Sequence, residues 1–129
     1  QRIWCLDGDG AVLMHMGGMA IIANSEANNL VHVVLNNGAH DSVGGQPTVG
    51  LSIDIAKIAS AMGYKQTYTV TSNTELTKVL NQIKEASGPI LINILVRKGN
   101  RPDLGRPTTT PIQNKQAFMA QILKTTDEA

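Results

Sequence analysis

Blocks of consecutive apolar residues alternate along the chain with blocks in which apolar residues recur at helical spacing. The consecutive blocks predict strands at residues 3–6, 30–35 and 90–96, and a further strand is predicted at residues 64–71, which are rich in Tyr, Thr and Val. The blocks between and after them predict helices at residues 13–23, 55–62, 76–83 and 112–123. The alternation predicts an α/β domain with three layers, in which helices cover both faces of an open parallel sheet of at least four strands.

Local signals mark the ends of several helices. Ser72 and Thr110 are followed three residues later by Glu75 and Gln113, which is the pattern of a capping box. Gly63 stands where the second helix should end. The sequence therefore predicts where these helices begin or end as well as where they lie.

The first and last helices carry expectations about packing. Residues 13–23 are apolar nearly all round, so we expect this helix to be buried on most faces. Gly17 and Gly18 lie inside it and each costs about 1 kcal/mol relative to alanine, which favours a close packing contact there. The last helix is expected to pack through Ile112, Phe118, Met119 and Ile122.

Composition narrows the class of protein. The 129 residues are 42% hydrophobic and 16% charged, which is typical of one soluble globular domain, residues 1–129. Eleven basic residues balance ten acidic ones to a net charge of +1. A balance this even argues against a broad nucleic-acid-binding surface.

Cysteine content and hydropathy bear on location. Cys5 is the single cysteine, which excludes an internal disulfide, a cysteine zinc site and a redox pair. No apolar run is long enough for a membrane span, and no signal-peptide pattern opens the sequence. We therefore expect a cytoplasmic protein. The start on an apparent core strand, without an initiator methionine, leads us to expect a fragment of a longer enzyme.

Two polar motifs follow neighbouring predicted strands. Gly8-Asp9-Gly10 follows the first strand and Asn36-Asn37 ends the second, with 25 residues between the motifs. That spacing accommodates the helix of a βαβ unit. Asp9 and Asn37 should then lie at the same edge of the sheet, where α/β folds bind ligands.

Other interpretations of the first motif were weighed. A Gly-Asp-Gly sequence after a strand is about as often a simple turn as a ligand site. The dinucleotide-binding pattern fails because Leu13 stands where its third glycine belongs. No glycine-rich loop ends in Gly-Lys-Ser/Thr, which argues against a P-loop nucleotidase.

Taken together, the two motifs resemble the diphosphate-and-metal motif of thiamine diphosphate enzymes. Two segments look like the corresponding segments of phosphonopyruvate decarboxylases: residues 36–48, NNGAHDSVGGQPT, and residues 101–107, RPDLGRP. Sulfopyruvate decarboxylases are similar at the Gln-Pro-Thr end of the first segment. The resemblance covers essentially the whole chain, as the carboxy-terminal, diphosphate-binding domain of a longer enzyme with the thiamine diphosphate-binding fold.

The resemblance implies a ligand set for Mg²⁺ and for the cofactor's diphosphate. The implied metal ligands are the Asp9 carboxylate, the side-chain oxygen of Asn37 and the backbone carbonyl of Ala39. Oxygen ligands of this kind are those that Mg²⁺ prefers beside phosphates and water. The residues expected to bind the cofactor are Gly8, Asp9, Gly10, Ala11, Asn37, Ala39 and His40.

Three further side chains were weighed for function. His40 could contact the diphosphate or the substrate, or it could serve only to order its loop. The two roles have equal weight. Arg101 and Arg106 could bind a phosphonate dianion through bidentate contacts. Their alternatives are a solvated loop or a contact to another subunit, which weigh more.

The implied reaction is the non-oxidative decarboxylation of a 2-keto acid, phosphonopyruvate, to phosphonoacetaldehyde and CO₂. The resemblance places the activating glutamate in a pyrimidine-binding domain, usually of another subunit of a homo-oligomer, so this chain has no identifiable catalytic residue. We expect the chain to be inactive alone. The alternatives are a sulfopyruvate decarboxylase, another thiamine diphosphate-dependent decarboxylase, and a non-catalytic module that binds a phosphorylated ligand.

Overall fold

The computed structural model describes residues 1–124. Within it the chain forms two compact units. The larger unit is Arg2–Gly99, and the smaller comprises Gln1 and the chain from residue 100 onward. No helix among the described residues is long and apolar enough to cross a membrane.

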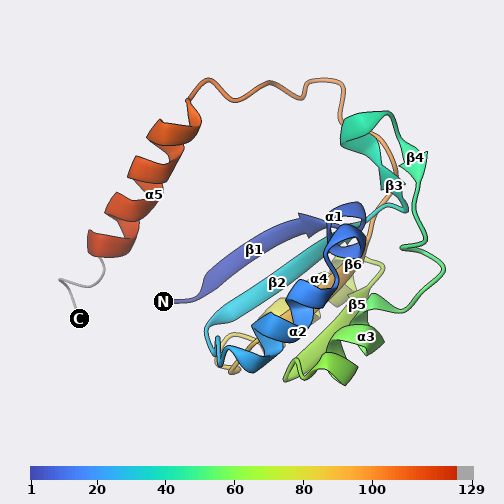
Figure 1. Cartoon of the computed structure of the whole chain (residues 1–129), viewed down its shortest axis with the longest axis vertical. Coiled ribbons are helices and arrows are strands. Elements are labelled where there is room, and N and C mark those ends of the chain that lie inside the picture. Colours follow the sequence, from blue (N-terminus) through green and yellow to red (C-terminus); the bar gives the residue numbers. More distant parts are fainter. Residues whose placement is uncertain (125–129) are drawn as a thin grey trace. The chain divides into compact units, whose positions relative to one another are not determined.

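A four-stranded parallel sheet forms the centre of the larger unit (Figure 1). Its strands, in spatial order, are β1 (Ile3–Gly8), β2 (Leu30–Asn36), β6 (Ile90–Leu95) and β5 (Gln66–Val70). The central strands β2 and β6 are almost wholly buried, as their aliphatic sequences predict. The predicted parallel α/β sheet is confirmed.

Helices cover both faces of this sheet and give it two separate cores. On one face lie α1 (Asp9–Met14), α2 (Gly17–Asn24) and α3 (Ile55–Met62), which pack on Val34 and Leu91. On the other face α4 (Asn73–Gln82) packs on a cluster from β2, β5 and β6. Successive strand residues point to opposite faces, so β6 contributes Leu91 to the first core and Ile92 to the second. The predicted three layers are confirmed.

Capping side chains fix where α3 and α4 begin. The Asp54 carboxylate accepts a hydrogen bond from the backbone N–H of Lys57 at 3.0 Å. At α4, the Ser72 hydroxyl accepts from the backbone N–H of Glu75 at 3.3 Å, and the Glu75 carboxylate reaches back to the N–H of Thr71. The predicted start of α4 is confirmed.

The single helix predicted over residues 13–23 is wrong. The structure has two short helices, α1 and α2, with a break between Met14 and Gly17. The break falls at His15 and Met16, and Gly17 and Gly18 form the first turn of α2 instead of lying inside one long helix, where glycine is costly. Met19 is buried, whereas Met14 and Ile21 are 75% and 72% exposed, so the expectation of burial on most faces is also wrong.

A small hairpin lies in the segment that connects β2 to α3. Its strands, β3 (Ala39–His40) and β4 (Gln46–Pro47), pair antiparallel around the 3₁₀ turn η1 (Asp41–Val43). Gly44 and Gly45 close the hairpin with positive φ angles of 109° and 74°, a conformation that glycine adopts readily. Two-residue strands are too short to show periodicity, so hydrophobic spacing does not predict this hairpin.

The smaller unit contains one helix, α5 (Pro111–Lys124). Its predicted capping box is confirmed: the Thr110 hydroxyl accepts from the N–H of Gln113, and the Gln113 side chain accepts from the N–H of Thr110. The predicted packing is wrong for Ile112, Phe118 and Met119, which are exposed. Periodicity predicts an apolar stripe on a helix, but it does not supply an element to cover it.

We expect Leu91→Ala to lower the free energy of unfolding by about 2–5 kcal/mol, because it opens a cavity in a core that includes β6 and α3. Leu91 is fully buried. Leu95, at the end of the same strand, is 37% exposed, so Leu95→Ala is the matched control and should cost much less. Urea unfolding measures both. Equal losses would contradict the assignment of Leu91 to the core.

Candidate functional site

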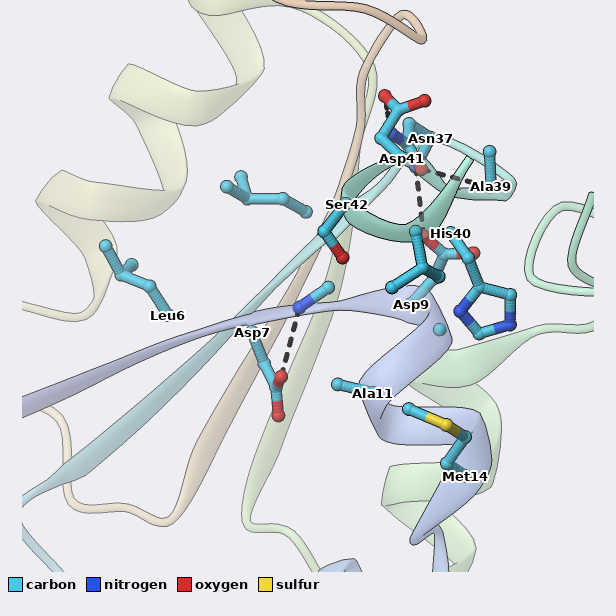
Figure 2. A pocket seen from close by; sticks show the side chains of 14 residues that line it. Leu6, Asp7, Asp9, Ala11, Met14, Asn37, Ala39, His40, Asp41 and Ser42 are labelled. Carbon is cyan, nitrogen blue, oxygen red and sulfur yellow. Dashed lines mark hydrogen bonds between the residues drawn. The ribbon is translucent and has the colours of Figure 1, made fainter. Parts of the chain in front are cut away.

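The two polar motifs meet at the carboxyl edge of the sheet, as their positions after β1 and β2 predict. The backbone N–H of Asn37 donates to the Asp9 carboxylate at 3.3 Å. Asp9 is the first residue of α1, and Asn37 follows β2 directly. Figure 2 shows both at the top of α1, beside the hairpin residues Ala39 and His40. The ends of two adjacent strands thus build one polar site.

Asp9 is a buried carboxylate without a cationic partner. Only 1% of the residue is exposed, and one of its oxygens accepts a hydrogen bond from the Thr48 hydroxyl. Within residues 1–124 no lysine, arginine or histidine forms an ion pair with it. A buried negative charge is costly unless it is paired or binds a metal. The local chemistry therefore favours a bound cation.

Two asparagine amides flank this carboxylate. The fully buried Asn36 donates to the carbonyl of Gly50 at 2.8 Å, and its oxygen accepts from the N–H of Gly38 at 3.2 Å. The Asn37 oxygen accepts from the N–H of Ala39 at 3.0 Å. These bonds hold the chain after β2 in a tight turn around Asp9.

Gly50 closes this arrangement from the other side. A Cβ atom at Gly50 would stand 2.5 Å from an Asp9 carboxylate oxygen and 2.8 Å from the Asn36 amide oxygen. Only glycine fits here without moving the site. The sequence analysis identified neither Gly50 nor Thr48 as site residues, because their contacts bridge about 40 residues and follow no local pattern.

Gly10, Ala11 and His40 lie where the first turn of α1 meets the hairpin. The first backbone N–H groups of a helix have no intrahelical partner, so those of Gly10 and Ala11 suit an anion. The His40 ring packs against Gly10, where an added Cβ would stand 2.3 Å from Nδ1. His40 is thereby held at the helix start by close contact with a glycine.

These residues surround a cavity of about 510 Å³. All seven residues expected to bind the cofactor line it: Gly8, Asp9, Gly10, Ala11, Asn37, Ala39 and His40. Leu6, Met14, Leu35 and Val43 form an exposed apolar wall of the same cavity. The predicted set is gathered in one place, and the role of each member stays a prediction.

The two arginines proposed to bind substrate belong to the smaller unit. These are Arg101, which forms an exposed ion pair with Asp103 at 3.2 Å, and Arg106. Their substrate role stays a prediction. Among the described residues no three His, Cys, Asp or Glu side chains gather in a metal-binding cluster. A metal at this edge would therefore depend on amide and carbonyl oxygens beside Asp9.

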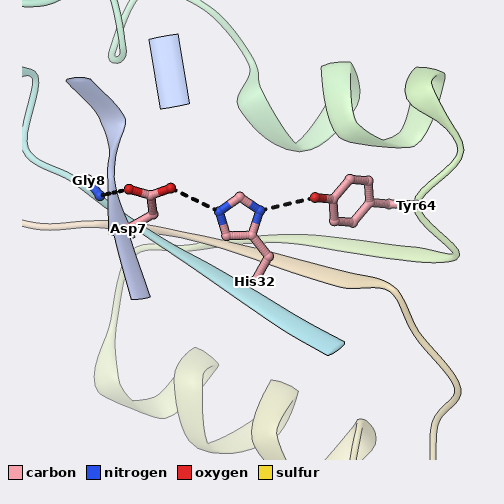
Figure 3. A network of polar contacts seen from close by, with 4 residues as sticks. All are labelled: Asp7, Gly8, His32 and Tyr64. Carbon is pink, nitrogen blue, oxygen red and sulfur yellow. Dashed lines mark hydrogen bonds and ion pairs between the residues drawn. The ribbon is translucent and has the colours of Figure 1, made fainter. Parts of the chain in front are cut away.

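A buried polar network lies behind the cavity (Figure 3). His32 is 3% exposed and stands between the Tyr64 hydroxyl, 3.1 Å from Nδ1, and the Asp7 carboxylate, 3.5 Å from Nε2. The Asp7 carboxylate can only accept, so it favours the tautomer with the proton on Nε2, in which Tyr64 donates to Nδ1. The other Asp7 oxygen accepts from the N–H of Gly8 at 3.1 Å. His32 thus links β1, through Asp7, to Tyr64, which follows α3.

Burial sets the protonation of this network. Burial lowers the pKa of His32, and the nearby Asp7 carboxylate opposes the change without reversing it. Burial also raises the pKa of Tyr64 to about 12, which keeps its hydroxyl protonated. The 3.5 Å separation of His32 from Asp7 is too long for a strong hydrogen bond, in agreement with the dominance of burial.

We expect acid to destabilise the fold through His32. Its pKa in the folded chain lies below the ordinary value near 6.5, so its contribution is complete above pH 6.5 and is lost as the pH falls towards the folded pKa. One proton changes the free energy of unfolding by up to about 1.4 kcal/mol per pH unit. Urea unfolding between pH 7.5 and 5 should show a shallower loss for His32→Gln. An unchanged slope would contradict the assignment.

Comparison with known proteins agrees with this site. The family model described as "Thiamine pyrophosphate enzyme, C-terminal TPP binding domain" matches residues 1–94. A phosphonopyruvate decarboxylase of Streptomyces viridochromogenes is 40% identical over 91% of the chain and 30% of its own length. The sulfopyruvate decarboxylase subunit beta of Methanothermobacter thermautotrophicus is 31% identical over 78% of the chain and 51% of its own length.

A solved structure shares the fold. A protein of Mycobacterium smegmatis, described as a thiamin diphosphate-dependent enzyme, superposes with a TM-score of 0.61 and 25% identity over 77% of the chain and 18% of its own length. The chain spans about a third of the phosphonopyruvate decarboxylase that it matches. The family match covers the sheet edge, both polar motifs and the hairpin. The chain belongs to the family of thiamine pyrophosphate enzymes, as their C-terminal TPP-binding domain.

Proposed function

We propose that this chain binds the diphosphate of thiamine diphosphate through Mg²⁺ and supplies that half of the active site of a phosphonopyruvate decarboxylase. One observation carries the proposal: Asp9, a buried carboxylate without an ion-pair partner among residues 1–124, meets Asn37 at a cavity in a TPP-binding domain. Its 40% identity to a phosphonopyruvate decarboxylase supports the choice of reaction.

The residues present fit a magnesium ion. The proposed ligands are the Asp9 carboxylate, the Asn37 side-chain oxygen and the carbonyl of Ala39, all hard oxygen donors. The cation would neutralise the buried charge of Asp9, which no described basic residue does. Gly50 supports the fit because its lack of a side chain allows the loop to close on the carboxylate.

The first turn of α1 would bind the diphosphate. The backbone N–H groups of Gly10 and Ala11 would donate to its oxygens, and the positive end of the helix would favour the same charge. His40, held against Gly10, is placed to donate from its ring. Thiamine diphosphate supplies the electron sink for decarboxylation, so the chain itself contributes position, charge and the exclusion of water.

The apolar wall of the cavity supports a half-site. Four apolar side chains are exposed although they line a cavity that also has polar lining residues: Leu6, Met14, Leu35 and Val43. No glutamate among residues 1–124 lines that cavity. We propose that a pyrimidine-binding domain of the same enzyme, from another subunit of a homo-oligomer, covers the wall and carries the activating glutamate.

Sulfopyruvate decarboxylase is the second candidate. Four relatives with that name are 27–33% identical to the chain, below the 39–40% of the two phosphonopyruvate decarboxylases. This favours the phosphonate, whose dianion suits the guanidinium groups of Arg101 and Arg106.

We expect Mg²⁺-dependent binding of thiamine diphosphate to be lost in Asp9→Asn and weakened at least tenfold in Asn37→Ala. Asp9→Asn removes the charge without changing the volume of the side chain. Isothermal titration calorimetry of the chain, with and without Mg²⁺, measures both effects. Asp103→Asn removes a charge from the smaller unit and should leave binding unchanged. Survival of Mg²⁺-dependent binding in both site variants would show that the metal ligands are wrongly assigned.

We expect the chain alone to release no aldehyde from phosphonopyruvate in the presence of thiamine diphosphate and Mg²⁺. An enzyme that joins it to a pyrimidine-binding domain should decarboxylate phosphonopyruvate with a higher kcat/KM than sulfopyruvate. A coupled assay for the aldehyde tests the first statement and CO₂ release tests the second. Sustained turnover by the chain alone would contradict the half-site, and a preference for sulfopyruvate would select the second candidate.

A further inference from the structure

Asp41 joins two segments that are far apart in the sequence. It opens the 3₁₀ turn η1, immediately after β3. One of its carboxylate oxygens, Oδ2, accepts hydrogen bonds from the Asn37 side-chain nitrogen at 2.8 Å and from the backbone N–H of Gly99 at 3.0 Å. Figure 2 shows Asp41 and Asn37 facing one another above the cavity. Nothing in the proposed reaction requires this carboxylate as a ligand.

The contact with Asn37 determines which end of its amide faces the cavity. A side-chain amide has an oxygen at one end and an NH₂ group at the other, and a carboxylate accepts hydrogen bonds only. The NH₂ group must therefore face Asp41, and the oxygen is left on the other side. That oxygen accepts one hydrogen bond, from Ala39, and has a second lone pair for a cation.

The contact with Gly99 attaches the same turn to the chain beyond β6. Gly99 donates this hydrogen bond while its φ angle is 101°, a conformation that glycine tolerates. Beside it, the Lys98 ammonium donates to the carbonyl of Gly45 at 2.5 Å. Two adjacent residues, 98 and 99, are therefore bonded to the two ends of the 41–45 turn.

We propose that Asp41 is a positioning residue, whose carboxylate orients the Asn37 amide for the cation and attaches the hairpin to Gly99. The inference rests on the proposed function, because the cation is the proposed Mg²⁺. Outer hydrogen bonds that orient a metal ligand typically contribute 10- to 100-fold to metal affinity. The same carboxylate thus assembles the cation site and fixes the point where the chain leaves the sheet unit.

Three variants separate hydrogen bonding from charge and from general stability. Asp41→Ala removes both hydrogen bonds. Asp41→Asn removes the charge but retains an oxygen that can accept both, since both fall on one atom. Glu75→Ala is the matched control, because Glu75 also accepts two hydrogen bonds on one carboxylate oxygen, from Thr71, at the start of α4.

The first measurement needs neither metal nor cofactor. Amide hydrogen exchange followed by NMR on the whole chain should show the Gly99 N–H and the Asn37 side-chain NH₂ protected in the unchanged protein and in Asp41→Asn. In Asp41→Ala both should exchange at least tenfold faster, while β6 amides keep their protection. Unchanged exchange at both groups in Asp41→Ala would overturn the proposed contacts.

The second measurement is Mn²⁺ binding in the presence of thiamine diphosphate, followed by electron paramagnetic resonance. We expect Asp41→Ala to weaken Mn²⁺ binding 10- to 100-fold, and Asp41→Asn and Glu75→Ala to stay within about threefold of the unchanged protein. Asp41→Asn as weak as Asp41→Ala would overturn the orienting role in favour of charge alone. Full binding by Asp41→Ala would overturn it altogether.

The two measurements distinguish failure of this inference from failure of the proposed function. If Asp9→Asn binds Mn²⁺ as well as the unchanged protein, the metal site is wrongly placed, and the proposed function and the orienting role both fail. If Asp9→Asn loses Mn²⁺ and Asp41→Ala does not, only the inference about Asp41 fails. Loss in both, with recovery in Asp41→Asn, supports both.

Discussion

The negative charge of Asp9, buried without an ion-pair partner among the described residues, is the constraint on which the rest of the site depends. An isolated charge in the protein interior is tolerated only where hydrogen bonds and a counter-charge compensate its loss of water. The N–H of Asn37 and the hydroxyl of Thr48 supply the hydrogen bonds. The missing counter-charge is what a divalent cation would provide, so the same carboxylate is a cost to the fold and the basis of the proposed function.

The surrounding backbone is shaped by this charge. Gly50 must lack a side chain for its segment to reach Asp9, and Gly10 must lack one for the His40 ring to lie over the helix start. Asn36 contributes no proposed ligand, yet it is fully buried and bonded to Gly50 and Gly38. Its role is to hold the turn closed. The proposed ligands and the residues that hold the turn closed therefore come from the same short segments of the chain.

The sequence predicted what depends on local or periodic patterns. The parallel sheet, its two covered faces and the caps at Ser72 and Thr110 follow from hydrophobic spacing and from residues three positions apart. The meeting of Asp9 with Asn37 followed from topology, since adjacent parallel strands end at one edge. The seven candidate residues at the cavity came from a family resemblance as well as from this geometry.

The rest depended on contacts that no local pattern encodes. Thr48 and Gly50 reach Asp9 across about 40 residues, and Asp41 reaches Gly99 across 58. The division of the first helix was missed because an apolar composition was taken as continuous helix, although Gly17-Gly18 already weakened it. The exposed apolar side chains of α1, α2 and α5 do not follow from the sequence pattern. An apolar stripe indicates that a helix face can be buried, but it does not identify the element that would bury it.

The central position of β2 has a consequence for the order of folding. β2 is held between β1, which precedes it, and β6, which begins 60 residues later at Ile90. Pairings of such long sequence separation carry a high entropic cost of loop closure and form slowly. The contact between Asp9 and Asn37 needs only β1 and β2, but the strand before Asn37 gains its second neighbour only after β6 has been synthesised. The hydrogen bond from Gly99 to Asp41 forms at that last stage, at the final residue of the unit.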